Sequence, residues 1–392
     1  MSEALNYHKS PIPGKIEISL PKPMQTEADL ALAYSPGVAE PVIEIAKDAS
    51  KVYDYTIKGN LVGVISNGTA ILGLGNQGAL ASKPVMEGKA ALFKKFANVN
   101  AFDIEINSTD PEQIIKTIAD ISPTFGGINL EDFKAPECFF IEEKLQELLD
   151  IPVFHDDQHG TAITMTAALI NACKLQNKSF DKINIVIQGA GASAIACANF
   201  LTHMGVTKNQ VILVDSRGVI NTARTDLNQY KQKFANSTNK TDLYEVIEGA
   251  DVFIGLAGAI IDHPEKFLQS MNVNPILFTL SNPTPSIPYN LIKESRKDSI
   301  IATGLSNLPN QVNNAVCFPY IFKGALIARA KKITIKMQLA AAHAIADIVN
   351  QPIKQEHKGI LPDKTLNKDY ILPKPYDPRL LEQVTAAVIN AV

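Results

Sequence analysis

The segment 183–194, INIVIQGAGASA, restricts most strongly what this chain can fold into. It is a β-branched run that ends in Gly-x-Gly-x-x-Ala and is followed by the helix-like stretch IACANFLTHMG. The first glycine permits a tight turn, the second lets a pyrophosphate approach the backbone, and the small third residue lets helix pack on strand. A second apolar run, VILV at 211–214, is followed by Asp215. A strand, turn and helix without a nucleotide would look similar locally, but the whole unit favours a Rossmann-type dinucleotide-binding domain.

Further apolar runs extend the series of strands, at 250–258, 276–280 and 299–304. Together they predict an α/β fold whose second part is a doubly wound, mostly parallel sheet. A length of 392 residues suits about two or three domains. We expect an N-terminal α/β domain over 1–158 and the Rossmann-type domain, with C-terminal helices and a tail, over 159–392. Within the first domain, Asn67-Gly68 between two apolar stretches predicts a β-hairpin.

Composition excludes several classes of protein. The formal net charge is −3 and no block of lysine and arginine occurs, which argues against nucleic acid or an anionic membrane as a partner. The N-terminus, MSEALNYHKS, lacks a secretory signal pattern, and no apolar run reaches the roughly 18 residues of a membrane span. The four cysteines are far apart without a CxxC pair, which argues against zinc or a disulfide framework. These features predict a soluble, cytoplasmic protein.

Two acidic clusters precede the dinucleotide loop, GGINLED at 126–132 and HDDQHGT at 155–161, separated by the helix-like EEKLQELLD at 142–150. Polar side chains that directly follow apolar runs belong at strand ends, where α/β enzymes bind ligands. Carboxylates this close repel one another unless a cation lies among them, and an all-oxygen ligand set favours Mg²⁺ or Mn²⁺. Alternatively, Asp157 and Thr161 cap the following helix while Glu131 and Asp132 lie in a turn. The two clusters together favour a metal site.

One lysine is unusual because of its place on a helix. In VMEGKAALFKKF at 85–96, Lys89 falls on the same face as Val85, Leu92, Phe93 and Phe96. Such a lysine either extends its ammonium to the edge of the apolar face or is held in a site. Desolvation beside a divalent cation would lower its pKa, which would let it act as a base near neutral pH.

The chain resembles the bacterial malic enzymes over nearly its whole length, through motifs that occur in the same order along the sequence. The motifs that carry the resemblance are ALAYSPGVAEP (31–41), VISNGTAILGLGN (64–76), PVMEGKA (84–90), PTFGGINLEDF (123–133), VFHDDQHGTA (153–162), SNPTP (281–285), PNQVNNAVCFP (309–319) and YILPKPYDPRL (370–380). The NADP-dependent type is the most similar. In that type a phosphotransacetylase-like domain often follows, and this chain ends near the point where it would begin.

The resemblance implies a role for each matching residue. Tyr34 would be the general acid and Lys89 the general base, with Asp156 holding Lys89 in place. Glu131, Asp132 and Asp157 would bind the cation, which requires the strand before them to have ended, because neighbours on a strand point to opposite faces. Asn282 and Asn314 would contact the nicotinamide end and the substrate, as would Lys89. The predicted cofactor-binding residues are Gly189, Ala190, Gly191, Ala192, Ser193, Asp215, Ser216, Arg217 and Asn282. One departure is Ala70, where larger eukaryotic members have an arginine that binds a malate carboxylate.

The implied function is oxidative decarboxylation of L-malate to pyruvate and CO₂ with NADP, dependent on Mg²⁺ or Mn²⁺, and we expect oxaloacetate decarboxylation as well. The choice of nucleotide depends on two opposed local arguments. Asp215 is placed to bind a ribose 2′-hydroxyl, as in NAD enzymes, whereas Arg217 can pair with the 2′-phosphate of NADP. The family resemblance favours NADP. The alternatives are another two-domain NAD(P)-dependent dehydrogenase or a catalytically silent metabolite-sensing module. A homodimer or higher homo-oligomer is expected.

Overall fold

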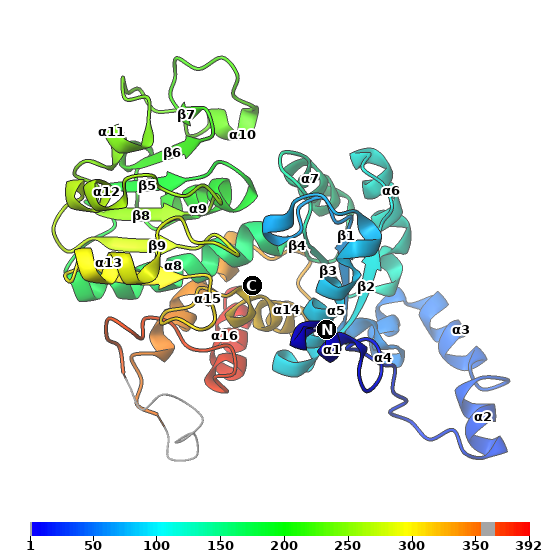
Figure 1. Ribbon diagram of the computed structural model, residues 1–392. Coiled ribbons are helices and arrows are strands. Elements are labelled where there is room, and N and C mark those ends of the chain that lie inside the picture. The colour runs from blue at the N-terminus through cyan, green and yellow to red at the C-terminus, as the bar shows by residue number, and fades with distance from the viewer. Residues whose placement is uncertain (1, 354–364) are drawn as a thin grey trace.

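The computed structural model describes residues 2–353 and 365–392. Its described strands form two sheets, which lie side by side in Figure 1. The first sheet is parallel throughout, with the order β2-β1-β3-β4, and its strands are β1 (Leu61–Ser66), β2 (Asn100–Glu105), β3 (Gly127–Leu130) and β4 (Val153–His155). The α-helices of this part of the chain are α1 (Glu3–Lys9), α2 (Glu27–Ala33), α3 (Ala39–Lys47), α4 (Val52–Tyr55), α5 (Ala79–Ala97), α6 (Pro111–Ile121) and α7 (Glu137–Leu148).

The second sheet has the order β10-β9-β8-β5-β6-β7, in which only β7 is antiparallel to its neighbour. Its strands are β5 (Ile185–Gln188), β6 (Val211–Asp215), β7 (Gly218–Val219), β8 (Val252–Gly255), β9 (Ile276–Thr279) and β10 (Ile300–Thr303). The strand order reverses at β5, and in doubly wound sheets ligands bind at that point, beyond the carboxyl ends of the strands. The glycine-rich loop 189–191 directly follows β5.

Nine helices complete the described chain, and the C-terminal ones join the two parts. They are α8 (Asp156–Gln176), α9 (Ala192–His203), α10 (Gln229–Gln232), α11 (Leu243–Ile247), α12 (Pro264–Ser270), α13 (Tyr289–Ser295), α14 (Phe318–Ile327), α15 (Ile335–Ile348) and α16 (Arg379–Ile389). Helix α8 packs against α9 and α15, and α14 packs against both α16 and α5. Phe318 and Phe322 of α14 pack edge to face on Phe93 of α5, with ring centroids 4.8 and 5.3 Å from that of Phe93. The core therefore continues from one sheet to the other.

The predicted α/β fold with a Rossmann-type second part is confirmed. The predicted boundary at residue 158 falls in the first turn of α8, and its position stays a prediction. The hairpin at Asn67-Gly68 is wrong. Both edges of β1 are already occupied by the parallel strands β2 and β3, so the chain after β1 cannot pair with it. Gly68 instead has φ +67° and touches the loop before α5, where an added Cβ would lie 2.2 Å from the carbonyl oxygen of Gly78.

The first helices stand apart from this core. In Figure 1, α2 and α3 project away from the rest of the molecule. Helices α1 to α4, all within the described residues, contain no buried residue. They nevertheless carry exposed apolar side chains, among them Leu30, Leu32, Val42 and Ile43. Along the described parts of the chain, no helix combines the length and apolar character needed to cross a bilayer.

Candidate active site

Lys89 is buried at the centre of a charged cluster. Its Nζ lies 2.6 Å from Asp156 Oδ2 and 2.7 Å from Glu131 Oε1, and only 11% of its side chain is exposed. The ring of Phe318 lies 4.3 Å from the same nitrogen. Lys89 is therefore held in a site, and the alternative that it extends to solvent is wrong.

The charge of Lys89 differs from the expected one. Burial alone would lower the pKa of Lys89, but the negative charges of Asp156 and Glu131 outweigh burial and raise this pKa. The expected lowering assumed a divalent cation beside the lysine, whereas in the protein alone its nearest charges are carboxylates. In this state Lys89 is an ammonium.

Glu131 and Asp132 lie together where β3 has ended. Strand β3 stops at Leu130, and Asp132 has φ +56°, so the alternation of a regular strand no longer applies to the pair. Both residues are buried. Burial raises the pKa of Glu131 well above its ordinary value, and the charges of Asp157, Asp156 and Asp132 add to this rise although Lys89 opposes it. The prediction that the strand ends before this pair is confirmed.

Asp157 lies in the first turn of α8 and faces the same cluster. Its Oδ2 accepts a hydrogen bond from the backbone N–H of Asp132 at 2.7 Å, which ties the two acidic segments together. The N-cap of α8 is His155, and no side chain caps this helix. The alternative in which Asp157 and Thr161 cap the helix is therefore wrong. Asn314 donates to Asp156 Oδ2 at 3.1 Å and to Thr161 Oγ1 at 3.2 Å.

A cavity of about 880 Å³ collects these side chains. Its lining includes one wall of acidic and basic residues and another from the dinucleotide loop and the loops after β9 and β10. Of the predicted residues, those that line it are Lys89, Glu131, Asp132, Asp157, Gly191, Ala192, Ser193, Asn282 and Asn314. Ala70 also lines it. Asp156 is not among the described lining residues of this cavity, but it contacts two that are, Lys89 and Asn314.

The donor set suits a hard divalent cation. Glu131, Asp132 and Asp157 offer only carboxylate oxygens to one cavity, which is the ligand type that Mg²⁺ and Mn²⁺ prefer. As the described side chains stand, no three or more His, Cys, Asp or Glu residues are already arranged around one ion position. The nearest positive charge to Glu131 is the ammonium of Lys89. The ligand assignment remains a prediction.

A second cavity, of about 620 Å³, continues from the first along the dinucleotide loop. Gly191 lines both cavities. Gly189 has φ +131°, and an added Cβ on Gly191 would meet no atom within 4 Å, so the loop presents open backbone at the N-terminus of α9. Such an N-terminus favours a phosphate group. The predicted residues around this cavity are Gly189, Ala190, Gly191, Asp215 and Ser216.

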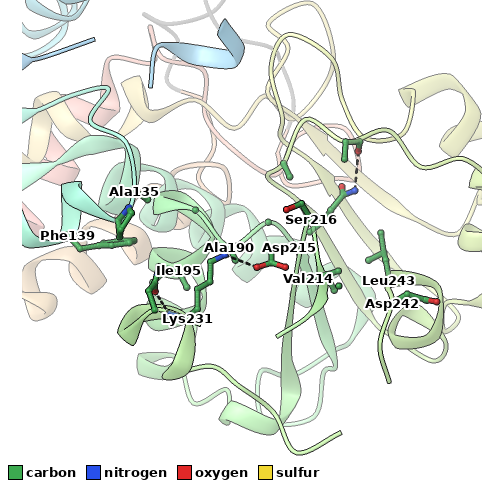
Figure 2. Close-up of a pocket in the computed structure, with 18 of the residues that line it drawn as sticks. Ala135, Phe139, Ala190, Ile195, Val214, Asp215, Ser216, Lys231, Asp242 and Leu243 are labelled. Atoms are coloured by element: carbon green, nitrogen blue, oxygen red, sulfur yellow. Dashed lines mark hydrogen bonds and ion pairs between the residues drawn. The ribbon is translucent and has the colours of Figure 1, made fainter. Parts of the chain in front are cut away.

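The side chains around Asp215 bear on both local arguments about the nucleotide. Arg224 Nη1 and Nη2 donate to the two oxygens of Asp215 at 2.7 and 3.2 Å, and Lys231 Nζ donates to Oδ2 at 2.7 Å. Figure 2 shows Asp215 and Lys231 linked at this cavity. Arg217 is 72% exposed and pairs with Asp226, and among the described lining residues Lys231 is present and Arg217 is not. Asp215 is thus already paired with Arg224 and Lys231.

Tyr34 lies away from both cavities. Its side chain is 69% exposed, at the C-terminal end of α2, and it lines neither of the two described cavities. The prediction that Tyr34 shares a site with Lys89 is not met within one chain.

Sequence reasoning did not find Arg224 or Glu142. Glu142 is a buried carboxylate on α7 that accepts hydrogen bonds from His155, Gln158 and His159. The only signal in the sequence was the motif HDDQHG itself, because the side chains of His155, Gln158 and His159 were left without a role once Asp156 and Asp157 were assigned. Arg224 had no signal, since it comes near Asp215 through a turn of the chain.

Comparison with known proteins agrees with this arrangement. Residues 13–111 and 107–146 match the model of the malic enzyme N-terminal domain, and 158–368 match that of the malic enzyme NAD binding domain. The chain is 52% identical to the NADP-dependent malic enzyme of Halomonas elongata, over 99% of this chain and 92% of that protein. It is 51% identical to the NADP-dependent malic enzyme of Escherichia coli, over 99% of this chain but only 52% of that protein.

A solved structure is also similar throughout. The NAD-dependent malic enzyme of Thermotoga maritima has a TM-score of 0.91 and 40% identity, with 100% of both chains covered. Together the two family models cover most of the chain, as does the Halomonas relative. The chain therefore belongs to the malic enzyme family.

Proposed function

We propose that this chain catalyses the oxidative decarboxylation of L-malate to pyruvate and CO₂, with NADP as hydride acceptor and Mg²⁺ or Mn²⁺ as cofactor. One observation carries the proposal. Lys89, three carboxylates and the dinucleotide-loop residues Gly191 to Ser193 line a single cavity. A base, a cation site and a hydride acceptor can therefore meet at one substrate carbon.

Lys89 is the proposed base for the hydroxyl proton of malate. When bound, a nicotinamide would accept the hydride from C2 and a divalent cation would polarise the C2 oxygen. Glu131 is the residue that couples these roles, because it contacts Lys89 and is also a proposed ligand. With Glu131 bound to a cation, Lys89 would lose one of the charges that stabilise its ammonium, which would bring it closer to a neutral base. Asp156 keeps Lys89 directed at the substrate through its 2.6 Å contact.

Substrate contacts are assigned to the asparagines of the cavity. Asn314 is held by Asp156 and Thr161 and directed at the cavity wall, and Asn282 lines it from the loop after β9. With Ala70 in place of an arginine, a malate carboxylate is bound by these amides and by the cation.

Proton delivery to C3 is assigned to Tyr34 of a second copy of the chain. Tyr34 is exposed at the C-terminal end of α2. Helices α2 and α3 form an arm that contains no buried residue, so the cavity with Lys89 in the same chain lacks this tyrosine. The arm carries exposed Leu30, Leu32, Val42 and Ile43, and apolar surface of this kind marks a protein contact. A homodimer in which each arm reaches the partner's cavity would bury that surface and complete both sites.

Two variants test the shared site. As homodimers, Tyr34→Phe and Lys89→Ala should each be inactive in the overall conversion of malate to pyruvate. After subunit exchange, the mixture should recover about a quarter of wild-type activity, because half of the dimers are mixed and each has one intact site. If the mixture stays inactive although mixed dimers form, Tyr34 does not act across subunits.

The assay for the function uses the full chain with L-malate, Mg²⁺ or Mn²⁺, and NADP or NAD, followed by the absorbance of the reduced cofactor. We expect cation-dependent reduction with a preference for NADP. Turnover without added cation in the presence of a chelator would contradict the ligand assignment. No turnover with either nucleotide would favour the catalytically silent module.

A further inference from the structure

A buried hydrogen-bond chain runs from Glu142 through Gln158 to His155, which lies beside Asp157, and the mechanism above does not use it. Glu142, on α7, accepts the backbone N–H of His155 at 2.9 Å and the Nε2–H of Gln158 at 3.0 Å. His159 Nε2 lies 2.9 Å from both carboxylate oxygens. Glu142, His155 and Gln158 are all buried. An ionised carboxylate with this many donors is fully hydrogen-bonded, which offsets its burial.

This hydrogen-bond chain determines which nitrogen of neutral His155 carries the proton. The same side-chain nitrogen of Gln158 touches Glu142 Oε2 and, at 2.9 Å, His155 Nδ1. A carboxylate only accepts hydrogen bonds, so the Gln158 atom facing it must be the NH₂ group. That group has a second N–H, and His155 Nδ1 must accept it. In neutral His155 the proton is then on Nε2, which lies 3.0 Å from Asp157 Oδ2.

We propose that Glu142 is a positioning residue that, through Gln158 and the Nε2–H form of His155, holds Asp157 in the orientation that binds the cation. This inference rests on the proposed function, in which Asp157 is a ligand. Asp157 Oδ2 then accepts the backbone N–H of Asp132 at 2.7 Å and lies 3.0 Å from His155 Nε2. Both hold one oxygen of the carboxylate and leave the other for the cavity that Asp157 lines. Partners of this kind keep metal ligands oriented in other sites.

The hydrogen-bond chain also assigns the residues of HDDQHG that are not ligands. Asp156 holds Lys89, His155 and Gln158 transmit the orientation, and His159 partners Glu142. Burial raises the pKa of Glu142, but the charge of His159 and the hydrogen bonds outweigh it, so this pKa lies below its ordinary value. Glu142 therefore remains an acceptor for all its donors.

The test measures Mn²⁺ binding to the full chain without substrate, from the electron paramagnetic resonance signal of free Mn²⁺. Gln158→Met keeps the side-chain length but removes the amide, and Glu142→Gln places an amide NH₂ against the donors. Both should weaken Mn²⁺ binding by about 10- to 100-fold. Glu147→Gln is the matched control, because Glu147 is on the same helix, exposed, and paired only with Lys144 among the described side chains. Its Mn²⁺ affinity should stay within about twofold of wild type.

A second measurement separates positioning from a merely structural role. In ¹⁵N-histidine spectra of the metal-free protein, His155, identified from its loss in His155→Gln, should carry its proton on Nε2 when neutral. Gln158→Met should shift that proton towards Nδ1 with an unchanged circular dichroism spectrum. If Glu142→Gln does not fold, Gln158→Met decides alone, because it leaves no buried charge without a partner.

The outcomes separate this inference from the proposed function. If Asp157→Asn binds Mn²⁺ as tightly as wild type, the ligand set fails and the positioning role fails with it. If Asp157→Asn loses Mn²⁺ while Gln158→Met and a folded Glu142→Gln stay within about twofold of wild type, only the positioning role fails. A wild-type His155 with its proton on Nδ1 also overturns it.

Discussion

The substitution Lys89→Met tests how far this lysine stabilises the site. It keeps the length of the side chain but removes the charge that lies 2.6 Å from Asp156 and 2.7 Å from Glu131. Removing one member of a buried ion pair leaves the other charge uncompensated and costs about 3–5 kcal/mol. Lys83→Met is the matched control on the same helix. Lys83 lies 2.6 Å from Asp103, whose side chain is 4% exposed, but Lys83 itself is 42% exposed, so its removal should cost less than that of Lys89.

The loss should depend on pH in a defined direction. In the wild type, burial and the charges of Asp157, Asp156 and Asp132 already raise the pKa of Glu131 above its ordinary 4.5, against the opposing effect of Lys89. Without Lys89 this pKa rises further. The folded variant then keeps a proton that the unfolded chain releases, so its free energy of unfolding decreases as the pH rises from about 4.5 towards the raised pKa. The deficit should be larger at pH ~8 than at pH ~5.

The measurement is urea unfolding followed by circular dichroism, at both pH values and with and without Mn²⁺. Mn²⁺ should recover part of the deficit, because a cation that binds only the folded state stabilises it. Equal shifts of the unfolding midpoint for Lys89→Met and Lys83→Met, or a deficit that is the same at both pH values, would refute the account of Lys89 as the counter-charge.

Three further predictions concern activity. Asp157→Asn should abolish malate oxidation and weaken Mn²⁺ binding in a folded protein, since it removes a ligand charge; normal turnover would exclude Asp157 as a ligand. Lys231→Ala should raise KM for NADP at least about tenfold, or about 1.4 kcal/mol, and leave KM for NAD nearly unchanged. Arg217→Ala should change both KM values less than Lys231→Ala does. A larger effect of Arg217→Ala on KM for NADP would instead assign the 2′-phosphate contact to Arg217. Lys89→Ala should stop hydride transfer from malate, whereas Tyr34→Phe should retain part of oxaloacetate reduction and slow pyruvate proton exchange; equal loss of every partial reaction would contradict separate roles.

Much of the fold followed from local pattern. The β-branched runs at 185–188, 252–255 and 276–279 are strands, because a buried parallel strand needs apolar side chains on both faces. The glycine loop follows β5 as expected, because its backbone conformation suits few other residues. The hairpin failed because strand pairing is not local. The chain does bend at Gly68, but the edges of β1 are taken by strands much later in the chain.

For the site, the sequence by itself determined which chemical groups are present and that they lie at strand ends and in the first turn of a helix. Lys89, Glu131, Asp132 and Asp157 share a cavity as their spacing on the elements indicated. Only the tertiary structure decided how those groups are charged and paired. The pKa of Lys89 depends on carboxylates from two other segments, and Lys231, on α10, contacts Asp215 although it comes 16 residues later in the chain. Charge–charge energies depend on distance in space and on burial, and spacing along the chain specifies neither.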